Sequence, residues 1–248
     1  MKKDRNDERK INYACATVQG EYHKAQGIEN QDNFIFLSKP EYAIMSVADG
    51  VGSQVYASEG SRSAVMAAAH ALEAYAEGSI ACEEIVGTLR SFYRNTIERG
   101  HEAHAGTTCI FAAVLRDKEL VVGKIGDGMC VVLVNDKAEY LSHEENDFAN
   151  VVDALSYETP IDAWDIRRIP LHYGDKAEVF MATDGIAGDV VPGKERECAA
   201  YFIKKVGDKK GEEANETLRD ILIRWGEDGS ADDKTAIVYK EQVKENDC

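Results

Sequence analysis

The sequence contains little proline and no stretch that would serve as a linker between domains. Only 4 of its 248 residues are proline, and no segment rich in glycine and serine interrupts it. Hydrophobic residues make up 44% of the chain and charged residues 30%, a balance that suits a sizeable core beneath a polar surface. We therefore expect one domain over residues 11–241, between a disordered charged tail at 1–10 and a short tail at 242–248.

Long apolar runs are also missing. No run approaches the ~20 residues that a membrane-spanning helix requires. Residues 1–10 are charged throughout and lack the apolar segment of a signal peptide. We expect a cytoplasmic protein with no membrane partner.

Positive charge is scarce: 29 Lys and Arg residues stand against 45 Asp and Glu residues, for a net charge of −16. This excess argues against the phosphate backbone of a nucleic acid as the main partner, because such binding needs clustered cations. No pair of cysteines has the CxxC spacing of a redox or zinc motif. Reduced thiols are expected, although the sequence leaves a disulfide open. The six cysteines are Cys15, Cys82, Cys109, Cys130, Cys198 and Cys248.

Hydrophobic patterning predicts strands, two helices, more strands, two further helices and a last strand. Strands are predicted at 34–37, 42–48, 107–115, 120–125, 129–134, 138–141, 166–171, 177–182 and 235–239, and helices at 53–77, 80–99, 194–206 and 212–225. Since short turns join the strands within each run, we predict an α+β fold in which helix pairs cover two antiparallel sheets. The polar segment 142–163 is long enough to be a functional loop or flap.

Five aspartates lie in short polar or glycine-flanked segments that border apolar runs. They are Asp32, Asp49, Asp127, Asp184 and Asp232. A carboxylate at the end of a buried strand costs several kcal/mol unless its charge is compensated. Several that converge from distant parts of a chain need cations, and clusters of oxygen ligands suit Mg, Mn or Ca. The pattern indicates a metal-dependent hydrolase.

Six short motifs occur together in one order along the chain. They are Asn30-Gln31-Asp32-Asn33, Ala48-Asp49-Gly50-Val51-Gly52, Gly106-Thr107-Thr108, Gly126-Asp127-Gly128, Thr183-Asp184-Gly185 and Asp232-Asp233-Lys234-Thr235. In order and spacing, residues 20–239 resemble the protein phosphatase 2C family. The resemblance implies a four-layer α-β-β-α sandwich and a serine/threonine phosphatase that hydrolyses phosphomonoesters with a metal-activated water on a binuclear Mn or Mg centre.

The resemblance also implies roles for single residues. Asp49 is expected to bridge two metal ions, with the Gly50 carbonyl as a further ligand, and Asp184 and Asp232 complete the first metal site. Asp127 matches the ligand of a weaker third metal in bacterial members. Asp32 is expected to orient metal-bound water. The implied partners are phosphoserine and phosphothreonine proteins and a cognate kinase.

Two positions depart from the family pattern. The family often has an arginine before the first acidic motif that holds the substrate phosphate, and here that position is Gly27; the family's glutamate is Gln31. A histidine upstream of Gln-Asp resembles a bacterial subgroup, so His23 is predicted to be catalytic and to replace the phosphate contact, with Lys24 as the other candidate. Both candidates stay open at this point.

Other functions remain open beside the phosphatase. The departures at Gly27 and Gln31 favour a weak or inactive regulatory module that binds phosphoproteins. A two-metal phosphodiesterase or nuclease is less consistent with the acidic composition.

Three other features of the sequence are expected to lie outside the metal centre. His101 and His104 have i,i+3 spacing but no third zinc ligand nearby. Ser53 is expected to cap the following helix. Asp233 is expected to be a neighbour of the metal site and not a ligand.

Overall fold

The computed structural model describes residues 9–142 and 154–243. The strands are β1 (Arg9–Val18), β2 (Asp32–Ser38), β3 (Tyr42–Asp49), β4 (Cys109–Leu115), β5 (Glu119–Ile125), β6 (Met129–Val134), β7 (Lys137–Ser142), β8 (Asp165–Pro170), β9 (Ala177–Ala182) and β10 (Lys234–Val243). The helices are α1 (Glu21–Gln26), α2 (Ala57–Ala76), α3 (Ile85–Thr96), α4 (Asp184–Ala187), α5 (Glu195–Val206) and α6 (Glu212–Asp228), with 3₁₀ turns at Cys82–Glu84 and Ile161–Ala163.

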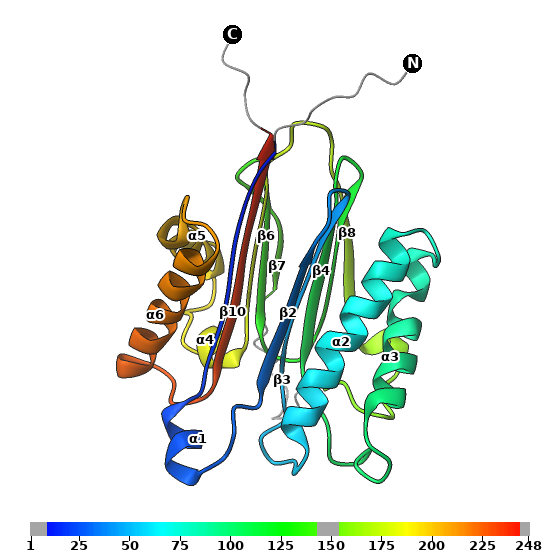
Figure 1. Cartoon of the computed structure of the whole chain (residues 1–248), viewed down its shortest axis with the longest axis vertical. Helices are drawn as coiled ribbons and strands as arrows, with labels where there is room; N and C mark the ends of the chain where they lie inside the picture. Colours follow the sequence, from blue (N-terminus) through cyan, green and yellow to red (C-terminus); the bar gives the residue numbers. More distant parts are fainter. Residues whose placement is uncertain (1–8, 143–153, 244–248) are drawn as a thin grey trace.

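Two five-stranded antiparallel sheets form the centre of the molecule. One has the strand order β1-β10-β9-β6-β7 and the other β2-β3-β4-β5-β8. Helices α2 and α3 cover the outer face of the second sheet, and α5 and α6 cover the first (Figure 1). The predicted α-β-β-α sandwich is confirmed.

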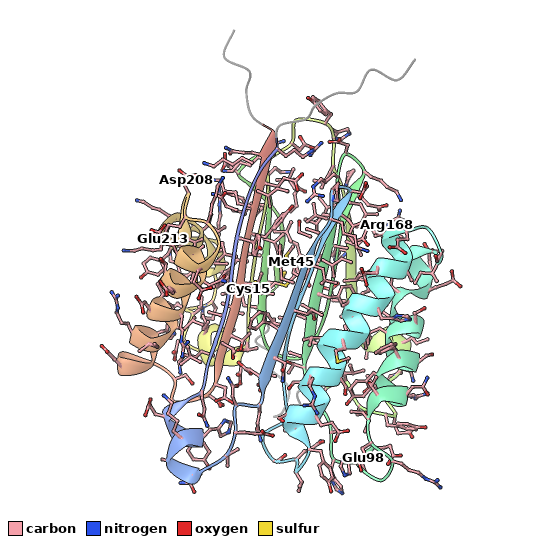
Figure 2. All side chains as sticks on the ribbon, viewed as in Figure 1. Cys15, Met45, Glu98, Arg168, Asp208 and Glu213 are labelled. Carbon is pink, nitrogen blue, oxygen red and sulfur yellow. The ribbon has the colours of Figure 1, made fainter. Side chains whose placement is uncertain are left out.

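The central strand β3 shows how the sequence produces these layers. Its side chains alternate between two buried faces, because successive residues of a strand point to opposite sides. Tyr42 and Ile44 pack under α2 and α3, whereas Met45 and Val47 pack against the other sheet. The space between the sheets is filled by side chains, Met45 among them (Figure 2). A strand buried on both faces reads as a continuous apolar run.

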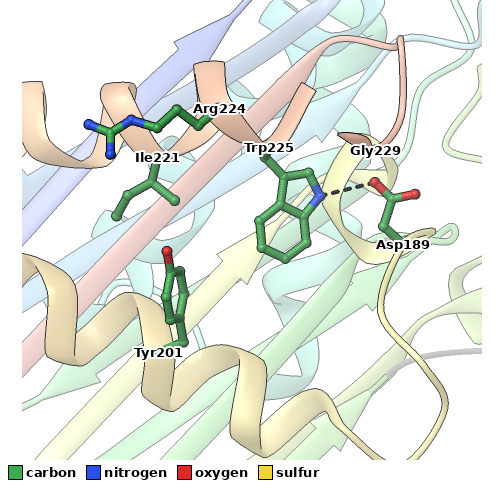
Figure 3. A pocket seen from close by; sticks show the side chains of 6 residues that line it. All are labelled: Asp189, Tyr201, Ile221, Arg224, Trp225 and Gly229. Atoms are coloured by element: carbon green, nitrogen blue, oxygen red, sulfur yellow. Dashed lines mark hydrogen bonds between the residues drawn. The ribbon is translucent and has the colours of Figure 1, made fainter. Parts of the chain in front are cut away.

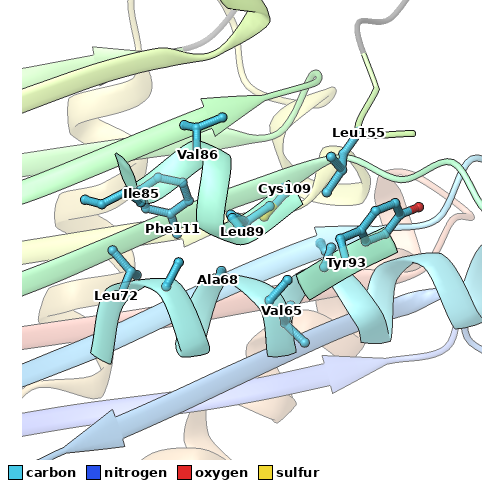
Figure 4. Packing of buried hydrophobic residues seen from close by; sticks show 14 of the residues in the cluster. Val65, Ala68, Leu72, Ile85, Val86, Leu89, Tyr93, Cys109, Phe111 and Leu155 are labelled. Atoms are coloured by element: carbon cyan, nitrogen blue, oxygen red, sulfur yellow. The ribbon is translucent and has the colours of Figure 1, made fainter. Parts of the chain in front are cut away.

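The outer layer of α2 and α3 is held by a single apolar cluster. Ala68 and Leu72 of α2 and Leu89 of α3 are fully buried, and their side chains meet Phe111 from the sheet (Figure 4). Small alanines on α2 let the helix lie close to the sheet and to α3. A matching cluster under α5 and α6 contains Phe180 stacked on Phe202, with ring centroids 4.7 Å apart.

The largest differences from the sequence prediction lie at short or weakly apolar elements. Strand β1 pairs with β10 from Arg9 onward, so residues 9 and 10, predicted to belong to the tail, are part of the sheet, and β10 extends to 243. The small residues Ala14 and Ala16 give β1 a weak hydrophobic signal. Helices α1 and α4 have six and four residues, which is too short to show a 3.6-residue period.

Two helix boundaries also differ. Helix α2 begins at Ala57 after Tyr56, with no side-chain cap, so the expected cap at Ser53 is wrong. Helix α3 ends at Thr96, and His101 and His104 therefore lie in a loop. The tight turn between β6 and β7 is formed by Asn135 and Asp136, which both have positive φ, as a two-residue hairpin turn requires.

None of the helices within residues 9–142 and 154–243 has the length and apolar character that crossing a membrane would take. Of the predicted flap at 142–163, residues 143–153 lie outside the described chain. In the described remainder, Leu155 is buried and forms a β-bridge with Thr107.

Candidate functional site

The five predicted aspartates all lie where strands begin or end. Asp32 begins β2 and Asp49 ends β3, Asp127 lies in the turn between β5 and β6, Asp184 follows β9 as the first residue of α4, and Asp232 precedes β10. Since β5 belongs to one sheet and β6 to the other, this turn crosses between the sheets. Helices α1 and α4 lie at the same end of the sandwich (Figure 1).

Strand pairing places Asp32 directly opposite Asp49. The two residues are partners in the antiparallel register of β2 and β3. Side chains opposite each other in such a pair have Cβ atoms about 5 Å apart. Two carboxylates this close repel each other unless a proton or a cation lies nearby. The pairing of Asp32 with Asp49 therefore requires a positive charge or a proton at this position.

The backbone of Asp49 is fixed by the Gly106-Thr107-Thr108 motif. The Thr107 hydroxyl and the Thr108 amide each donate to the Asp49 carbonyl oxygen at 2.7 Å, and the Asp49 amide donates to the Thr108 hydroxyl at 3.0 Å. The Val51 amide donates to the Gly106 carbonyl. The motif therefore holds the end of β3 in place.

A pocket of about 200 Å³ joins most of these residues. Its lining comprises His23, Gln31, Asp49, Gly50, Val51, Gly52, Thr108, Asp127, Asp184 and Asp232. Asp32 lies behind it, 4% exposed, and accepts a hydrogen bond from the Thr183 hydroxyl at 2.7 Å. Every predicted metal-binding position thus borders one pocket, and Asp32 supports it from the interior.

The carboxyl groups of the site are held in conditions that disfavour their charge. Burial raises the pKa of Asp32 to about 7, and repulsion from Asp233 adds to the effect. Burial, then repulsion from Asp32 and Asp184, raises the pKa of Asp49 well above its ordinary value. Burial, then repulsion from Asp127 and Asp232, raises the pKa of Asp184 to about 6. Clustered carboxyls with raised pKa values are the electrostatic mark of a cation site.

The buried oxygen atoms of the site test whether divalent cations fit here. Within the described part of the chain, Asp32 Oδ1, Asp184 Oδ1 and Gln31 Oε1 are buried and make no hydrogen bond. An unsatisfied buried acceptor costs about 1–3 kcal/mol. Carboxylate and amide oxygens are also the donors that Mg and Mn prefer. The residues present therefore fit such ions.

Glycines near the site are required by close backbone contacts. A Cβ on Gly50 would lie 2.3 Å from the Ala57 carbonyl oxygen at the start of α2, and one on Gly185 would lie 2.0 Å from the Asp233 carbonyl oxygen. Gly50 is therefore explained by its contact with α2, in addition to any approach to an ion. Gly27 ends α1 with φ of 68°, in the left-handed region, which gives a structural reason for glycine at the family's arginine position.

The histidine candidate is buried at the pocket. His23 is 6% exposed, lines the pocket, and has its Nδ1 atom 2.7 Å from Asp233 Oδ2 and 3.9 Å from Asp232 Oδ1. Lys24 is exposed, pairs with Glu21 at 2.7 Å and is not among the residues that line the pocket. Geometry therefore favours His23 over Lys24 as the residue that faces a substrate.

Asp233 is the residue that the sequence interpretation undervalued. It is 1% exposed and, together with His23 and Asp232, forms a group whose potential ligand atoms lie within 4.8 Å of one another. The sequence led us to expect only a neighbour of the metal site and not a ligand. The signal that it was buried is the strand that starts at the next residue, Lys234.

Two other features do not join this site. His101 Nδ1 lies 2.6 Å from Glu59 Oε2, and its ring stacks on Tyr56. His104 is exposed, and among the described residues neither histidine belongs to a cluster of three potential metal ligands. The His101–Glu59 pair fastens the loop after α3 to α2.

A second pocket, of about 480 Å³, lies between α5 and α6. Figure 3 shows Tyr201 and Trp225 in its lining and the Trp225 indole N–H that donates to Asp189 at 3.0 Å. Asp189 also accepts from the Ser230 amide at 2.8 Å, which joins the loop after α4 to the segment before Asp232. This pocket contains one carboxylate, so the aspartate chemistry belongs to the first pocket.

Comparison with known proteins gives one family and one fold. The family model described as protein phosphatase 2C matches residues 19–223. A search of the curated proteins found no matching sequence.

Several solved structures share the fold across nearly the whole chain at low sequence identity. The Mycobacterium tuberculosis serine/threonine phosphatase PstP is 17% identical, with a TM-score of 0.63, over 95% of this chain and 99% of that one. The photosystem II phosphatase PBCP is 15% identical, with a TM-score of 0.66, over 95% and 99%. RsbX in complex with magnesium is 18% identical, with a TM-score of 0.59, over 96% and 97%.

The family match covers most of the chain, and the residues that carry the family's motifs meet at one end of a sandwich of the same fold. On this evidence the chain belongs to the protein phosphatase 2C family.

Proposed function

We propose that this protein is a metal-dependent serine/threonine phosphatase that hydrolyses phosphomonoesters of phosphoserine and phosphothreonine proteins. One observation carries the proposal. Asp49, Asp184 and Asp232 come from three separate strand ends and border one pocket, and the pKa values of Asp49 and Asp184 are raised by burial and mutual repulsion. A binding module has no need of such a costly arrangement, whereas a cation-dependent hydrolase does.

The metal centre that we propose holds two Mg or Mn ions. Asp49 would bridge them, the Gly50 carbonyl would add a ligand, and Asp184 and Asp232 would complete the first site, with Asp127 at a third, weaker one. The chemistry supplied at such a centre is Lewis acidity towards phosphoryl oxygens and a lowered pKa of water.

The protein's own groups then hold and orient the reacting parts. Thr107 and Thr108 fix the backbone of Asp49, and Thr183 holds the Asp32 carboxyl through one oxygen while Oδ1 makes no hydrogen bond to the described chain. Asp32, which lies behind the pocket lining, would orient a water molecule in the pocket. His23 lines the pocket and would contact the phosphate or the leaving oxygen of the substrate.

The comparisons support this function at the level of the family. PstP is named a serine/threonine phosphatase, and RsbX was solved with magnesium. We extend the substrate class and the metal from those proteins to this chain as part of the proposal, together with a cytoplasmic location and a cognate serine/threonine kinase as partner.

One observation favours a second function, a weakly active or inactive module that binds phosphoproteins. Gln31 replaces a family glutamate and lines the pocket with an amide, so the metal centre has one carboxylate fewer. The same pocket would then bind a phosphate group without hydrolysing it.

Phosphatase assays after removal of metal distinguish the two functions. We expect hydrolysis of p-nitrophenyl phosphate and of phosphothreonine peptides to disappear in EDTA and to return with Mn or Mg. A phosphotyrosine peptide is the control and should be a poor substrate. Full activity in verified metal-free protein would exclude the metal-dependent mechanism. Phosphopeptide binding without turnover at any metal concentration would identify the module instead.

A further inference from the structure

Asp233 has the most complete set of hydrogen-bond partners among the acidic residues near the pocket. Its Oδ1 accepts from the Gly20 amide at 2.7 Å, and its Oδ2 accepts from the Gln31 amide at 2.6 Å and lies 2.7 Å from His23 Nδ1. The three donors come from the segment that contains α1 and leads into β2. One buried carboxylate thus ties the whole α1 segment to the start of β10.

A nearby cation and the two amide hydrogen bonds stabilise the negative charge of the buried Asp233 carboxylate. Asp233 attracts the neighbouring ammonium group of Lys234, which is itself buried and donates to the Asp232 carbonyl oxygen at 2.6 Å. Amide hydrogen bonds to a carboxylate are charge-assisted and roughly twice as strong as neutral ones. Asp233 is therefore an acceptor at both oxygens.

This environment fixes the state of the His23 ring. The Gly20 and Gln31 amides can only donate, so both oxygens of Asp233 act as acceptors, and the ring nitrogen that faces Oδ2 is placed as a donor: the hydrogen lies on His23 Nδ1. Nε2 makes no hydrogen bond to any residue of the described chain, and His23 lines the pocket. With Nδ1 held by Asp233, Nε2 is the ring nitrogen left to meet a ligand in the pocket.

We propose that Asp233 is a positioning residue that fixes the orientation and tautomer of His23, so that Nε2 is the atom presented to the phosphoryl group of the substrate. This proposal rests on the proposed phosphatase function only for the identity of the group that Nε2 meets. The pairing also accounts for two residue types in this chain. His23 lies close in sequence to Gly27, the position at which the family often has an arginine, and Asp233 supplies the acceptor for His23 Nδ1.

Long-range ¹⁵N NMR of the histidine rings tests the tautomer directly. In the Mg-loaded protein at about pH 8.5, His23 should carry its hydrogen on Nδ1, with a tautomer ratio of about tenfold or more in favour of this form. The spectrum of His23→Asn identifies the signal. A His23 ring that carries its hydrogen mainly on Nε2 would overturn the proposal.

A double-mutant cycle tests whether Asp233 acts through His23. His23→Asn is the matched variant, because its side-chain amide replaces the Nδ1 donor and nothing replaces Nε2. Asp233→Asn should lower kcat/KM for a phosphothreonine peptide about tenfold in the wild-type background and less than about twofold in the His23→Asn background. Thermal unfolding must show that each variant is folded.

The outcomes separate this proposal from the phosphatase function. An equal effect of Asp233→Asn in both backgrounds would make Asp233 a purely structural residue and would overturn the proposal. Loss of Mn binding stoichiometry in His23→Asn, measured by calorimetry, would place the ring in the metal site and would overturn it as well. If the wild-type protein has no phosphatase activity, the NMR result still decides whether Asp233 positions His23.

Discussion

At the scale of single residues, the aspartates around the pocket differ in how strongly their surroundings oppose their charge. Burial, followed by repulsion from Asp32 and Asp184, raises the pKa of Asp49 well above its ordinary value. Asp127 is partly exposed in the turn between β5 and β6, and no other proposed ligand lies in that turn. Loss of a central carboxylate should therefore disturb the site more than loss of one at its rim.

Asp49→Asn should abolish binding at the main metal pair and lower kcat about 10³-fold or more, since metal ions contribute several kcal/mol of charge stabilisation to the transition state. Asp184→Asn and Asp232→Asn should be nearly as severe. Asp127→Asn should leave the main pair occupied and slow turnover less. Calorimetric titration with Mn measures this order.

The control for this series is Asp136→Asn, a substitution in the exposed turn between β6 and β7 where positive φ suits asparagine. It should bind Mn as the wild type does. Unchanged Mn stoichiometry in Asp49→Asn would remove Asp49 from the metal centre.

At the scale of secondary-structure elements, the site depends on how closely α4 approaches β10. Asp184 is the first residue of α4 and Asp232 precedes β10, and Gly185 packs against the backbone of Asp233 between them. The Thr183 amide donates to the Thr235 carbonyl oxygen at 3.0 Å, which joins the same two elements. The distance between the two proposed metal ligands therefore depends on the close contact at Gly185 together with this hydrogen bond.

Gly185→Ala should push α4 away from β10, because its Cβ would lie 2.0 Å from a backbone oxygen. Overpacking of this kind costs about 1–3 kcal/mol of folding free energy. The displaced Asp184 should also weaken Mn binding. Urea unfolding and calorimetry measure the two effects.

Gly87→Ala in α3 is the matched control, since no atom lies within 4 Å of the new Cβ. It should raise stability by about 0.5–1 kcal/mol through helix propensity and leave Mn binding unchanged. Equal Mn affinity of the wild type and of a folded Gly185→Ala protein would contradict the role of this contact.

At the scale of the whole molecule, the acidic site couples folding to pH and to metal. The folded-state pKa of Asp32 is raised to about 7 and that of Asp184 to about 6, above their ordinary values. A raised carboxyl pKa contributes stability that is fully present below the unfolded value, near 4, and is lost as the pH rises through the folded value. The metal-free protein should therefore lose stability between about pH 4 and pH 7.

In EDTA, raising the pH from about 5.5 to 8 should remove about 2 kcal/mol of folding free energy through Asp32 alone. Saturating Mg should stabilise the protein more at pH 8 than at pH 5.5, because protons and cations compete for the same carboxylates. Asp32→Asn is the control and should show a smaller dependence on pH in EDTA. Denaturant unfolding at the two pH values measures it, and equal Mg stabilisation at both would contradict the coupling.

The sequence by itself determined the layered α+β architecture and the ligand candidates. Apolar runs such as 42–48 and 177–182 could be assigned because a strand buried on both faces is apolar at every position. Asp49 and Asp184 could be selected because charged residues at the ends of such runs are costly, and their order matched a family pattern.

The tertiary structure alone decided which groups meet and in what state. Nothing in the local sequence shows that Asp32 lies opposite Asp49, because strand register depends on the pairing of whole strands. The burial of His23 and Asp233 likewise arises from contact between segments 210 residues apart, and α1 is too short to signal its position by periodicity. The hydrogen-bond partners and the charge environment of the site follow from that long-range packing. A single sequence shows which residue types are present, but not which of them come into contact.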